Sequence, residues 1–226
     1  MLNNKVTPRA FKDAAYAAFA QVTKAMGSPR RLELLDLLVQ GPRTVEQLAL
    51  GTAQPVPSAS QHLQVLRRAR LVQTQRRGTH VVYRLAPEVG PVFVALRRLA
   101  QARSPELQAA RGDFFGPEGP LEVIHAEELR SLLAEGRVAL LDVRPADEFE
   151  HAHIAGARSI PFEELPERLN ELPRDQLVVA TCRGPYCALA IQAVRLVRAS
   201  GRSAVRYEEG VAEWQLDGGQ LASSAG

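Results

Sequence analysis

The chain has 226 residues and a net charge of +3, a length that allows two modest domains, each with its own core. The charge is divided: residues 1–111 hold 17 Lys and Arg against 6 Asp and Glu, and residues 112–226 hold 11 against 19, so only the first half suits a polyanion such as nucleic acid. The sequence has no apolar run of about 18 residues and no signal-peptide core, which excludes a membrane span and predicts a cytoplasmic protein with no membrane partner. It has only two cysteines, which excludes a disulfide framework.

The first half is predicted to be mostly helical, with one hairpin. Apolar residues recur at helical spacing, and Ser, Thr and Pro positions mark helix starts. Two extended stretches meet at Gly78, which indicates a β-hairpin. In chain order, the first expected helices are 11–26, 30–39 after the cap Ser28-Pro29, a short helix from Thr44 through Leu50, and a helix that Ser58 caps and that runs to about Arg68. The expected strands are Val72–Arg77 and Thr79–Leu85. One last helix starts near Pro87 and carries Val92, Val94, Leu96, Leu99 and Leu107.

Two short helices with a turn and then an arginine-rich hairpin form a winged helix-turn-helix, whose second helix enters the DNA major groove. Separated motifs occur in order within it: Ser58-Ala59-Ser60-Gln61-His62-Leu63-Gln64-Val65-Leu66, Ala69-Arg70-Leu71-Val72, Arg76-Arg77-Gly78 and Tyr83-Arg84-Leu85. With these motifs, residues 7–110 closely resemble the ArsR-type repressors. The resemblance implies a homodimer that is built on the first and last helices and reads a palindromic operator in double-stranded DNA. It also implies DNA contacts from Ser58, Ser60, Gln61 and His62 in the recognition helix and from Arg76, Arg77 and His80 in the wing.

The chemistry of these side chains agrees with that role, because Gln reads adenine, short hydroxyls suit phosphate, and Arg suits a groove or backbone. Two neighbouring features stay open. A charged run at the end of the recognition helix, Arg67, Arg68 and Arg70, either contacts phosphate or only solvates the helix end. Apolar residues on the last helix, Val92, Leu96 and Leu99, form either plain core or a dimer seam, and we favour the seam.

Many ArsR-type repressors sense metals through cysteine pairs before the recognition helix, or through His and acidic clusters on the last helix. The corresponding segments here, residues 44–49 and 89–96, hold no Cys, no His and one carboxylate. A transition-metal site needs about three or four ligands within reach. We therefore expect no metal site in this domain and no cofactor, so that the signal must enter elsewhere.

Residues 111–120, with the sequence RGDFFGPEGP, are predicted to link two domains, 1–110 and 121–226. Three glycines and two prolines in ten residues oppose a continuing helix, and the charge changes sign there. We expect Phe114 and Phe115 to dock on one of the domains, because fully solvated linkers rarely carry aromatic residues.

After the linker, short apolar strands alternate with helices, which predicts an α/β domain with a parallel sheet covered on both faces. The expected strands are Val123-Ile124, Val138–Asp142, Leu177–Thr181 and Val205–Tyr207, and the expected helices are Glu127–Ala134, Pro145–Glu150, Ala188–Ser200 and Val211–Trp214. Ligands of such sheets bind at the carboxyl ends of the strands. At one of these ends lies the hexapeptide Cys182-Arg183-Gly184-Pro185-Tyr186-Cys187. A strand, a tight turn with a cysteine and a helix N-terminus favour a thiolate, because backbone N–H groups converge there.

Five ordered motifs accompany this loop, and together they resemble a single rhodanese (sulfurtransferase) domain over residues 121–219. They are Leu141-Asp142-Val143-Arg144, Glu148-Phe149, His153-Ile154-Ala155-Gly156-Ala157, Ile160-Pro161 and Gly210-Val211-Ala212-Glu213-Trp214. The resemblance implies that the nucleophile Cys182 takes a sulfane sulfur from a small donor such as thiosulfate or polysulfide and passes it to a thiol acceptor. It further implies that Arg183, Gly184, Pro185, Tyr186 and Cys187 form the cradle of the persulfide, and we expect Asp142 and Arg144 to hold the loop.

The role of Cys187 stays open between a small residue at a helix start and a resolving thiol that captures modified Cys182 as a disulfide. A spacing of five residues brings the two thiols near each other without fixing the Cα separation that a disulfide requires. We expect His151 and His153 to be surface or structural residues, because a persulfide relay needs no proton shuttle there.

Three functions compete. The favoured one is a DNA-binding regulator whose second domain senses reactive sulfur or oxidants while remaining a competent sulfurtransferase. In the second, the chain is a sulfurtransferase enzyme with an autoregulatory DNA-binding domain. The third, reduction of an arsenic or other oxyanion, is disfavoured, because phosphate-sized oxyanions go with a longer loop that ends in arginine.

Overall fold

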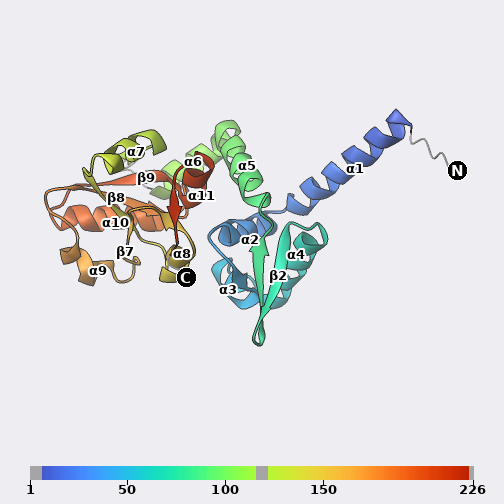
Figure 1. The fold of residues 1–226 in the computed structure, drawn as a ribbon, viewed down its shortest axis with the longest axis horizontal. Helices are drawn as coiled ribbons and strands as arrows, with labels where there is room; N and C mark the ends of the chain where they lie inside the picture. The colour runs from blue at the N-terminus through green and yellow to red at the C-terminus, as the bar shows by residue number, and fades with distance from the viewer. Residues whose placement is uncertain (1–6, 116–121, 224–226) are drawn as a thin grey trace. The chain divides into compact units, whose positions relative to one another are not determined.

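The computed structural model describes residues 7–115 and 122–223, and Figure 1 shows their helices and strands. The chain divides after Gly90 into two compact units, and each is described by itself. Within the described ranges, no helix is long and apolar enough to cross a membrane.

The first unit is a small helical core with a three-stranded sheet. Its helices are α1 (Pro8–Met26), α2 (Pro29–Val39), α3 (Val45–Gly51) and α4 (Val56–Arg68), and its strands are β1 (Arg43–Thr44), β2 (Val72–Arg77) and β3 (His80–Leu85). The strands are antiparallel in the order β1-β3-β2. Leu34, Leu48 and Leu63 are fully buried, one each from α2, α3 and α4. Hydrophobic burial of this kind holds three short helices together that would be marginal in isolation.

Local sequence signals place most of these elements. Thr44 and Gln47 form the capping box at the start of α3, with Gln47 N 3.4 Å from Thr44 Oγ1 and Thr44 N 2.9 Å from Gln47 Oε1. The hairpin register pairs Arg77 with His80 around Gly78, whose φ of 59° favours glycine. The cap predicted at Ser58 is wrong, because α4 starts at Val56 after Pro55 and Ser58 already lies in its first turn.

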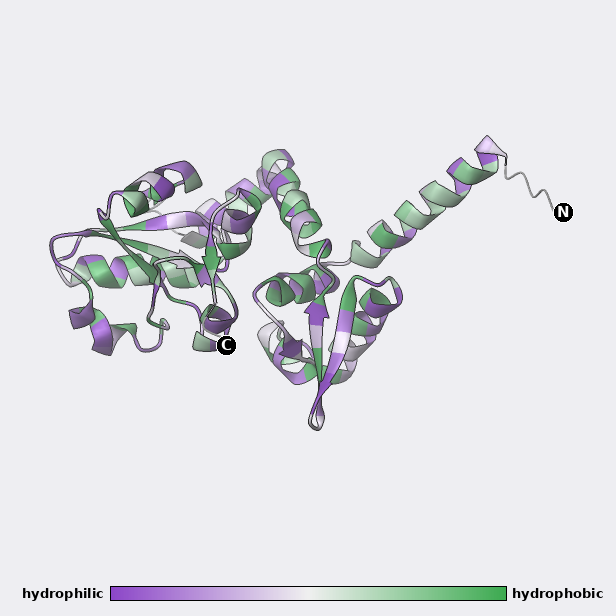
Figure 2. Cartoon of the chain, in the orientation of Figure 1, coloured by the Kyte–Doolittle hydropathy of each residue, from purple (hydrophilic) through white to green (hydrophobic). Residues whose placement is uncertain are grey.

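Helix α1 exposes its apolar residues. Only Ala25 and Met26 at its C-terminal end are buried, whereas Phe11, Tyr16 and Phe19 expose 67%, 69% and 62% of their surfaces. Figure 2 shows apolar residues recurring along this helix. An aromatic face of this size on a long helix is typical of a surface that is covered in an assembly.

The last helix predicted for the first half is two helices, α5 (Val89–Arg103) and α6 (Pro105–Phe115). They meet at Ser104, whose Oγ accepts a hydrogen bond from Leu107 N at 3.2 Å, and Pro105 opens the new helix. From Pro91 onward both helices belong to the second unit.

Helix α6 also covers residues 111–115 of the predicted linker, because a helix tolerates Gly112 at a cost of about 1 kcal/mol. Residues 116–120 of the linker lie outside the described residues. Phe114 is exposed, and the docking expected for Phe115 concerns a side chain outside the described residues.

The second unit contains a five-stranded parallel sheet in the order β4-β9-β8-β5-β7. The strands are β4 (Val123–Ile124), β5 (Val138–Asp142), β7 (Arg158–Ser159), β8 (Leu177–Cys182) and β9 (Ala204–Gly210). The helices are α7 (Ala126–Ala134), α8 (Ala146–His151), α9 (Leu165–Arg168), α10 (Ala188–Ala199) and α11 (Val211–Leu216), with a short 3₁₀ turn at Leu169–Glu171. A separate antiparallel pair joins β6 (His153–Ile154) to β10 (Leu221–Ala222).

Alternate residues of the central strand β8 enter two different cores. Val178 and Ala180 pack with Val194 of α10, while Val179 packs with Leu129 of α7 and with residues of α11. Helices therefore cover both faces of the sheet, as the alternating pattern predicts, and Figure 1 shows them around the strands. This arrangement brings the end of β8 and the start of α10 to the carboxyl edge of the sheet.

Candidate functional site

The cysteine hexapeptide forms the turn between β8 and α10. Cys182 is the last residue of β8 and is 1% exposed, and Cys187 is the N-cap of α10. Cys187 N donates to Gly184 O at 3.1 Å, which closes the turn. Gly184 has a φ of 145°, a value that side chains with a Cβ rarely adopt. The predicted order of strand, cysteine turn and helix N-terminus is therefore present, and the positive end of α10 faces this turn.

The two cysteines are joined by a disulfide, with their Cα atoms 6.4 Å apart. That separation lies within the range that disulfides use, so the loop supplies the proximity that the spacing alone left open. The pair links the end of a buried strand to the start of a helix.

Asp142 and Arg144 form a buried ion pair next to this strand. Arg144 Nη2 lies 2.7 Å from Asp142 Oδ2 and also donates to Ala152 O at 2.8 Å, and both side chains are at most 1% exposed. Val143 N between them donates to Thr181 O at 3.2 Å. The ion pair thus links the end of β5 to Ala152, the residue after α8. The hydrogen bond from Val143 reaches Thr181, the residue that precedes Cys182.

Arg183 points to helix α8. Its Nη2 lies 2.6 Å from Glu148 Oε1 and its Nε lies 3.0 Å from both carboxylate oxygens. Glu148 is almost completely buried, at 1% exposed. The positive charge that the sequence places in the loop is consequently paired with a buried carboxylate.

The two histidines near α8 differ in environment. The ring of His153 stacks on Phe149 at 3.7 Å, and its Nδ1 lies 2.8 Å from Phe149 O, a structural arrangement. Desolvation and the nearby charge of Arg144 hold the pKa of His151 below its usual value.

Helix α5 contacts the cysteine turn through Arg97. The Nη1 and Nη2 atoms of Arg97 lie 3.3 and 3.4 Å from the point where a Cβ on Gly184 would be. Arg97 also forms an ion pair with Glu213 of α11, and both side chains are buried. Gly210 packs so closely on the turn that a Cβ there would lie 2.5 Å from Arg183 O.

Two further arginines join α5 and α6 to the same unit. Arg98 Nη2 lies 2.7 Å from Asp217 Oδ2 and 3.1 Å from Glu209 Oε1. Arg111 Nη2 lies 2.7 Å from Glu208 Oε1, and the guanidinium stands 6.0 Å from the centre of the Tyr186 ring. Tyr186 itself is 39% exposed at the rim of the turn.

Sequence reasoning did not select Arg97, Arg111, Glu148 or Glu213 as site residues. Glu148 and Glu213 lie inside motifs that carry the rhodanese resemblance, and this is the sequence signal by which they could have been found. Arg97 lies on the polar side of its helix by periodicity, and local periodicity does not show a partner 116 residues away.

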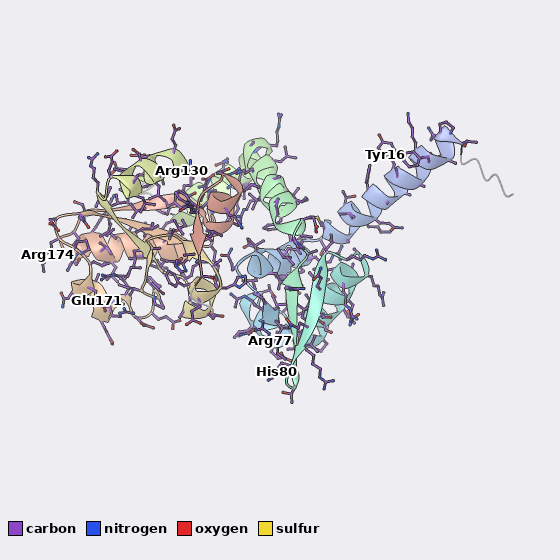
Figure 3. The ribbon with its side chains drawn as sticks, viewed as in Figure 1. Tyr16, Arg77, His80, Arg130, Glu171 and Arg174 are labelled. Carbon is purple, nitrogen blue, oxygen red and sulfur yellow. A yellow bond between two sulfur atoms is a disulfide. The ribbon has the colours of Figure 1, made fainter. Side chains whose placement is uncertain are left out.

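The residues predicted to contact DNA lie on α4 and on the hairpin of the first unit. Gln61 is exposed on α4, and Ser58, Ser60 and His62 are half-buried beside it. The wing residues, Arg76, Arg77 and His80, are exposed, and Figure 3 shows Arg77 and His80 near the end of the hairpin. Among the described residues, no group of three or more His, Cys, Asp or Glu side chains is arranged to hold a metal ion.

Known proteins are similar to this chain over both units. The model of the bacterial regulatory protein arsR family matches residues 28–74, and the model of the rhodanese-like domain matches residues 125–217. The HTH-type transcriptional regulator Rv0324 of Mycobacterium tuberculosis is 41% identical over 208 residues, covering 92% of this chain and 91% of that protein.

Single-unit similarities add detail. The thiosulfate:glutathione sulfurtransferase of Homo sapiens is 34% identical over 100 residues, covering 38% of this chain and 87% of that protein. Among solved structures, the homodimeric winged helix-turn-helix DNA-binding domain Mb0332 of Mycobacterium bovis is 36% identical with a TM-score of 0.40, covering 43% of this chain and 90% of that chain.

Proposed function

Because this chain belongs to the arsR family of DNA-binding transcriptional regulators and carries a C-terminal rhodanese-like domain, we propose that it senses reactive sulfur species or oxidants through Cys182. The observation that carries the proposal is the bond between Cys182 and Cys187 at the carboxyl end of β8. A buried thiol at a helix N-terminus, with a second thiol within bonding distance, is suited to capture a sulfur atom and then to record the event as a disulfide.

The capture step uses a sulfane sulfur donor, for which thiosulfate is the simplest example. The Cys182 thiolate attacks the outer sulfur of thiosulfate, the S–S bond of the donor breaks, and sulfite leaves with the bonding electron pair. Cys182 becomes a persulfide anion, Cys182–S–S⁻. The backbone N–H groups of the turn and the N-terminus of α10 stabilise this anion.

The second step uses Cys187. Its thiol attacks Sγ of Cys182, a disulfide forms, and the outer sulfur leaves with the thiol proton as hydrosulfide, HS⁻. The sulfane sulfur is thereby reduced to sulfide, and the two thiols are oxidised to one disulfide. An acceptor thiol that takes the outer sulfur of the persulfide first would instead return Cys182 to its starting state.

The DNA side of the proposal rests on the first unit. Gln61 on α4 reads a base edge, Ser58, Ser60 and His62 contact bases or phosphates nearby, and Arg76, Arg77 and His80 contact the groove or backbone. We assign the exposed aromatic face of α1 and the exposed Val92, Leu96 and Leu99 of α5 to the interface of a homodimer that binds a palindromic operator.

The test is a titration of DNA from upstream of the chain's own gene with full-length protein in three states: reduced, disulfide-bonded, and persulfidated by thiosulfate or polysulfide in the Cys187→Ser variant, in which the persulfide is not resolved. A regulatory coupling changes the dissociation constant by about 5- to 150-fold between reduced and modified protein. The change must be absent from Cys182→Ser. Identical dissociation constants for all three states would overturn the sensor proposal.

A second function is favoured by the similarity to the human thiosulfate:glutathione sulfurtransferase: the chain is itself a sulfurtransferase, with DNA binding serving only autoregulation. Under that proposal, transfer of sulfur from thiosulfate to a thiol or to cyanide turns over with wild-type protein and stops in Cys182→Ser. Catalytic sulfur transfer, together with a DNA affinity that is the same in all three states, would favour the enzyme. A DNA affinity that differs between the states favours the sensor.

A further inference from the structure

One residue of helix α5 lies directly against the cysteine turn. Arg97 is 8% exposed, and its Nη1, Nη2 and Cζ atoms are 3.3, 3.4 and 3.5 Å from the position of a Cβ on Gly184. Gly184 lies between Cys182 and Cys187, and its carbonyl accepts the hydrogen bond from Cys187 N that closes the turn. The guanidinium is thus in contact with the centre of the proposed sensing loop.

The same guanidinium is held from the other side by Glu213. Glu213 is 2% exposed, pairs with Arg97 through Oε1, and accepts a hydrogen bond from Gly210 N through Oε2 at 3.1 Å. Gly210 in turn packs on the backbone of Arg183 and Gly184. The turn, Gly210, Glu213 and Arg97 therefore form a closed ring of contacts, so a movement of the turn is expected to act on the ion pair.

When one member of a buried ion pair is displaced, its partner is expected to move with it. Separating two buried charges leaves each without its partner in a poorly hydrated place, so the pair moves as a unit or reorganises. Opening the disulfide changes how the two ends of the turn are tied together. A persulfide adds one sulfur atom to Cys182, and its negative charge, which a disulfide lacks, attracts the adjacent cation.

Helix α5 also carries the residues on which the proposed dimer depends. Val92, Leu96 and Leu99 are 52%, 39% and 58% exposed, and Arg97 lies among them in sequence. Only three residues, Ala86 to Glu88, separate the end of the wing strand β3 from the start of α5. A shift of α5 therefore acts on a dimer surface and on the chain segment that leads to the wing.

We propose that Arg97 is the positioning residue that couples the chemical state of the Cys182–Cys187 turn to helix α5 and, through it, to operator affinity. This inference rests on the proposed sensor function and names how its signal leaves the sulfur site. Arg98, the next residue, serves as the matched control. It pairs with Asp217 and Glu209 on the same unit and is 38% exposed in its side chain, so it holds α5 in place by charges of the same kind.

The experiment compares three full-length proteins: wild type, the double variant Arg97→Met/Glu213→Gln, and Arg98→Met. The double variant removes both charges together, so no buried charge is left unpaired. For each protein, the ratio of operator dissociation constants is measured between the reduced state and the state reached after treatment with polysulfide. We expect a ratio of about 5 or more for wild type and Arg98→Met, and a ratio within about twofold of unity for the double variant.

The outcomes separate the two proposals. A wild-type ratio of unity overturns the sensor function itself. A wild-type ratio that survives in the double variant overturns the role of Arg97 alone, and so does a ratio lost equally in Arg98→Met, which would assign the coupling to general docking of α5.

A measurement on wild-type protein covers the case in which the double variant does not fold. The side-chain Nε–H resonance of Arg97, assigned with Arg97→Lys, is followed by NMR between the reduced state and the state reached after treatment with polysulfide. We expect this resonance to move clearly more than that of Arg98. Equal or absent movement overturns the proposal.

Discussion

Arg183 and Glu148 are joined by three short contacts, of which the closest, between Nη2 and Oε1, is 2.6 Å. The pair connects the cysteine turn to helix α8, 35 residues earlier in the chain. A buried carboxylate next to the turn offsets the arginine charge that would otherwise stabilise a thiolate or persulfide at Cys182. The reactivity of the turn is therefore set by Glu148 as well as by the residues of the hexapeptide.

The first prediction concerns that carboxylate. In reduced protein, Glu148→Gln removes the buried carboxylate that pairs with Arg183, so the pKa of the Cys182 thiol is expected to fall. Alkylation by iodoacetamide across a pH series, with the labelled peptide quantified by mass spectrometry, gives that pKa. Glu150→Gln, an exposed change on the same helix, is the control. A pKa that stays constant or rises in Glu148→Gln contradicts the argument.

The second prediction assigns the two thiols. After reduction, Cys182 is expected to alkylate faster than Cys187 near neutral pH, because the turn and the N-terminus of α10 stabilise its thiolate. With polysulfide, Cys187→Ser is expected to accumulate a persulfide on Cys182, detected as one added sulfur atom by mass spectrometry, while Cys182→Ser forms none. Persulfide in Cys182→Ser would remove the nucleophile assignment, and wild-type protein that accumulates as much persulfide as Cys187→Ser would remove the resolving role.

The third prediction concerns base reading. Gln61 is exposed on α4, and Gln61→Ala is expected to lower the preference for one operator base pair by about 1–3 kcal/mol. Binding to a panel of single-base-pair operator variants measures this. Gln64→Ala, an exposed glutamine one turn along the same helix, is the control and should leave the preferences unchanged. A uniform loss of affinity at every sequence in Gln61→Ala would assign it to the phosphate backbone instead.

The fourth prediction concerns the exposed face of α1. Phe19 is 62% exposed, and Phe19→Glu is expected to shift the protein from dimer to monomer and to weaken operator binding, since a charge would be buried without a partner in the interface. Sedimentation equilibrium gives the dimer dissociation constant, and Gln21→Glu on the same helix is the matched change at a polar position. An unchanged dimer in Phe19→Glu places the interface elsewhere.

The fifth prediction is a pH dependence. Burial raises the pKa of Tyr207, whose hydroxyl donates to Glu209 at 3.2 Å, so the neutral phenol is favoured in the folded chain. A group with a raised pKa contributes stability below its unfolded value of about 10, and that contribution is lost as pH rises above it. Tyrosinate absorbance of the folded protein just above that pH is therefore expected to be the same in wild type and Tyr207→Phe. A smaller absorbance in the variant would show that Tyr207 ionises in the native state.

Much of the sulfur site follows from local sequence. The strand from Leu177, the turn at Cys182 and the helix from Ala188 occur where periodicity and turn residues predict them, because each signal is contained within a few residues. The hairpin around Gly78 follows from the same kind of local signal. Strands β6, β7 and β10 are not predicted, since each has only two residues and none is a pair of β-branched apolar residues as Val123-Ile124 is.

The parts that sequence reasoning missed depend on distant partners. Arg97 reads as a surface residue on a polar helix face, and only the fold brings it to Glu213. Ser104-Pro105 is a recognisable helix start, yet the continuous apolar pattern around it favoured a single helix. The glycines and prolines of 111–120 predict an end to the helix, yet Gly112 is accommodated inside α6.

Because α5 and α6 are attached to the second unit, they limit where this chain can be cut when its second unit is transferred to another protein. A rhodanese-like module transferred to another regulator from residue 121 onward would leave behind Arg97, Arg98 and Arg111, and with them the counter-ions of Glu213, Asp217 and Glu208. Glu213 would then be a buried carboxylate without its cation, a loss of about 3–5 kcal/mol when a buried pair is broken. A chimera that keeps these ion pairs has to be joined at the boundary after Gly90, so that α5 and α6 are inherited together with the rhodanese-like domain.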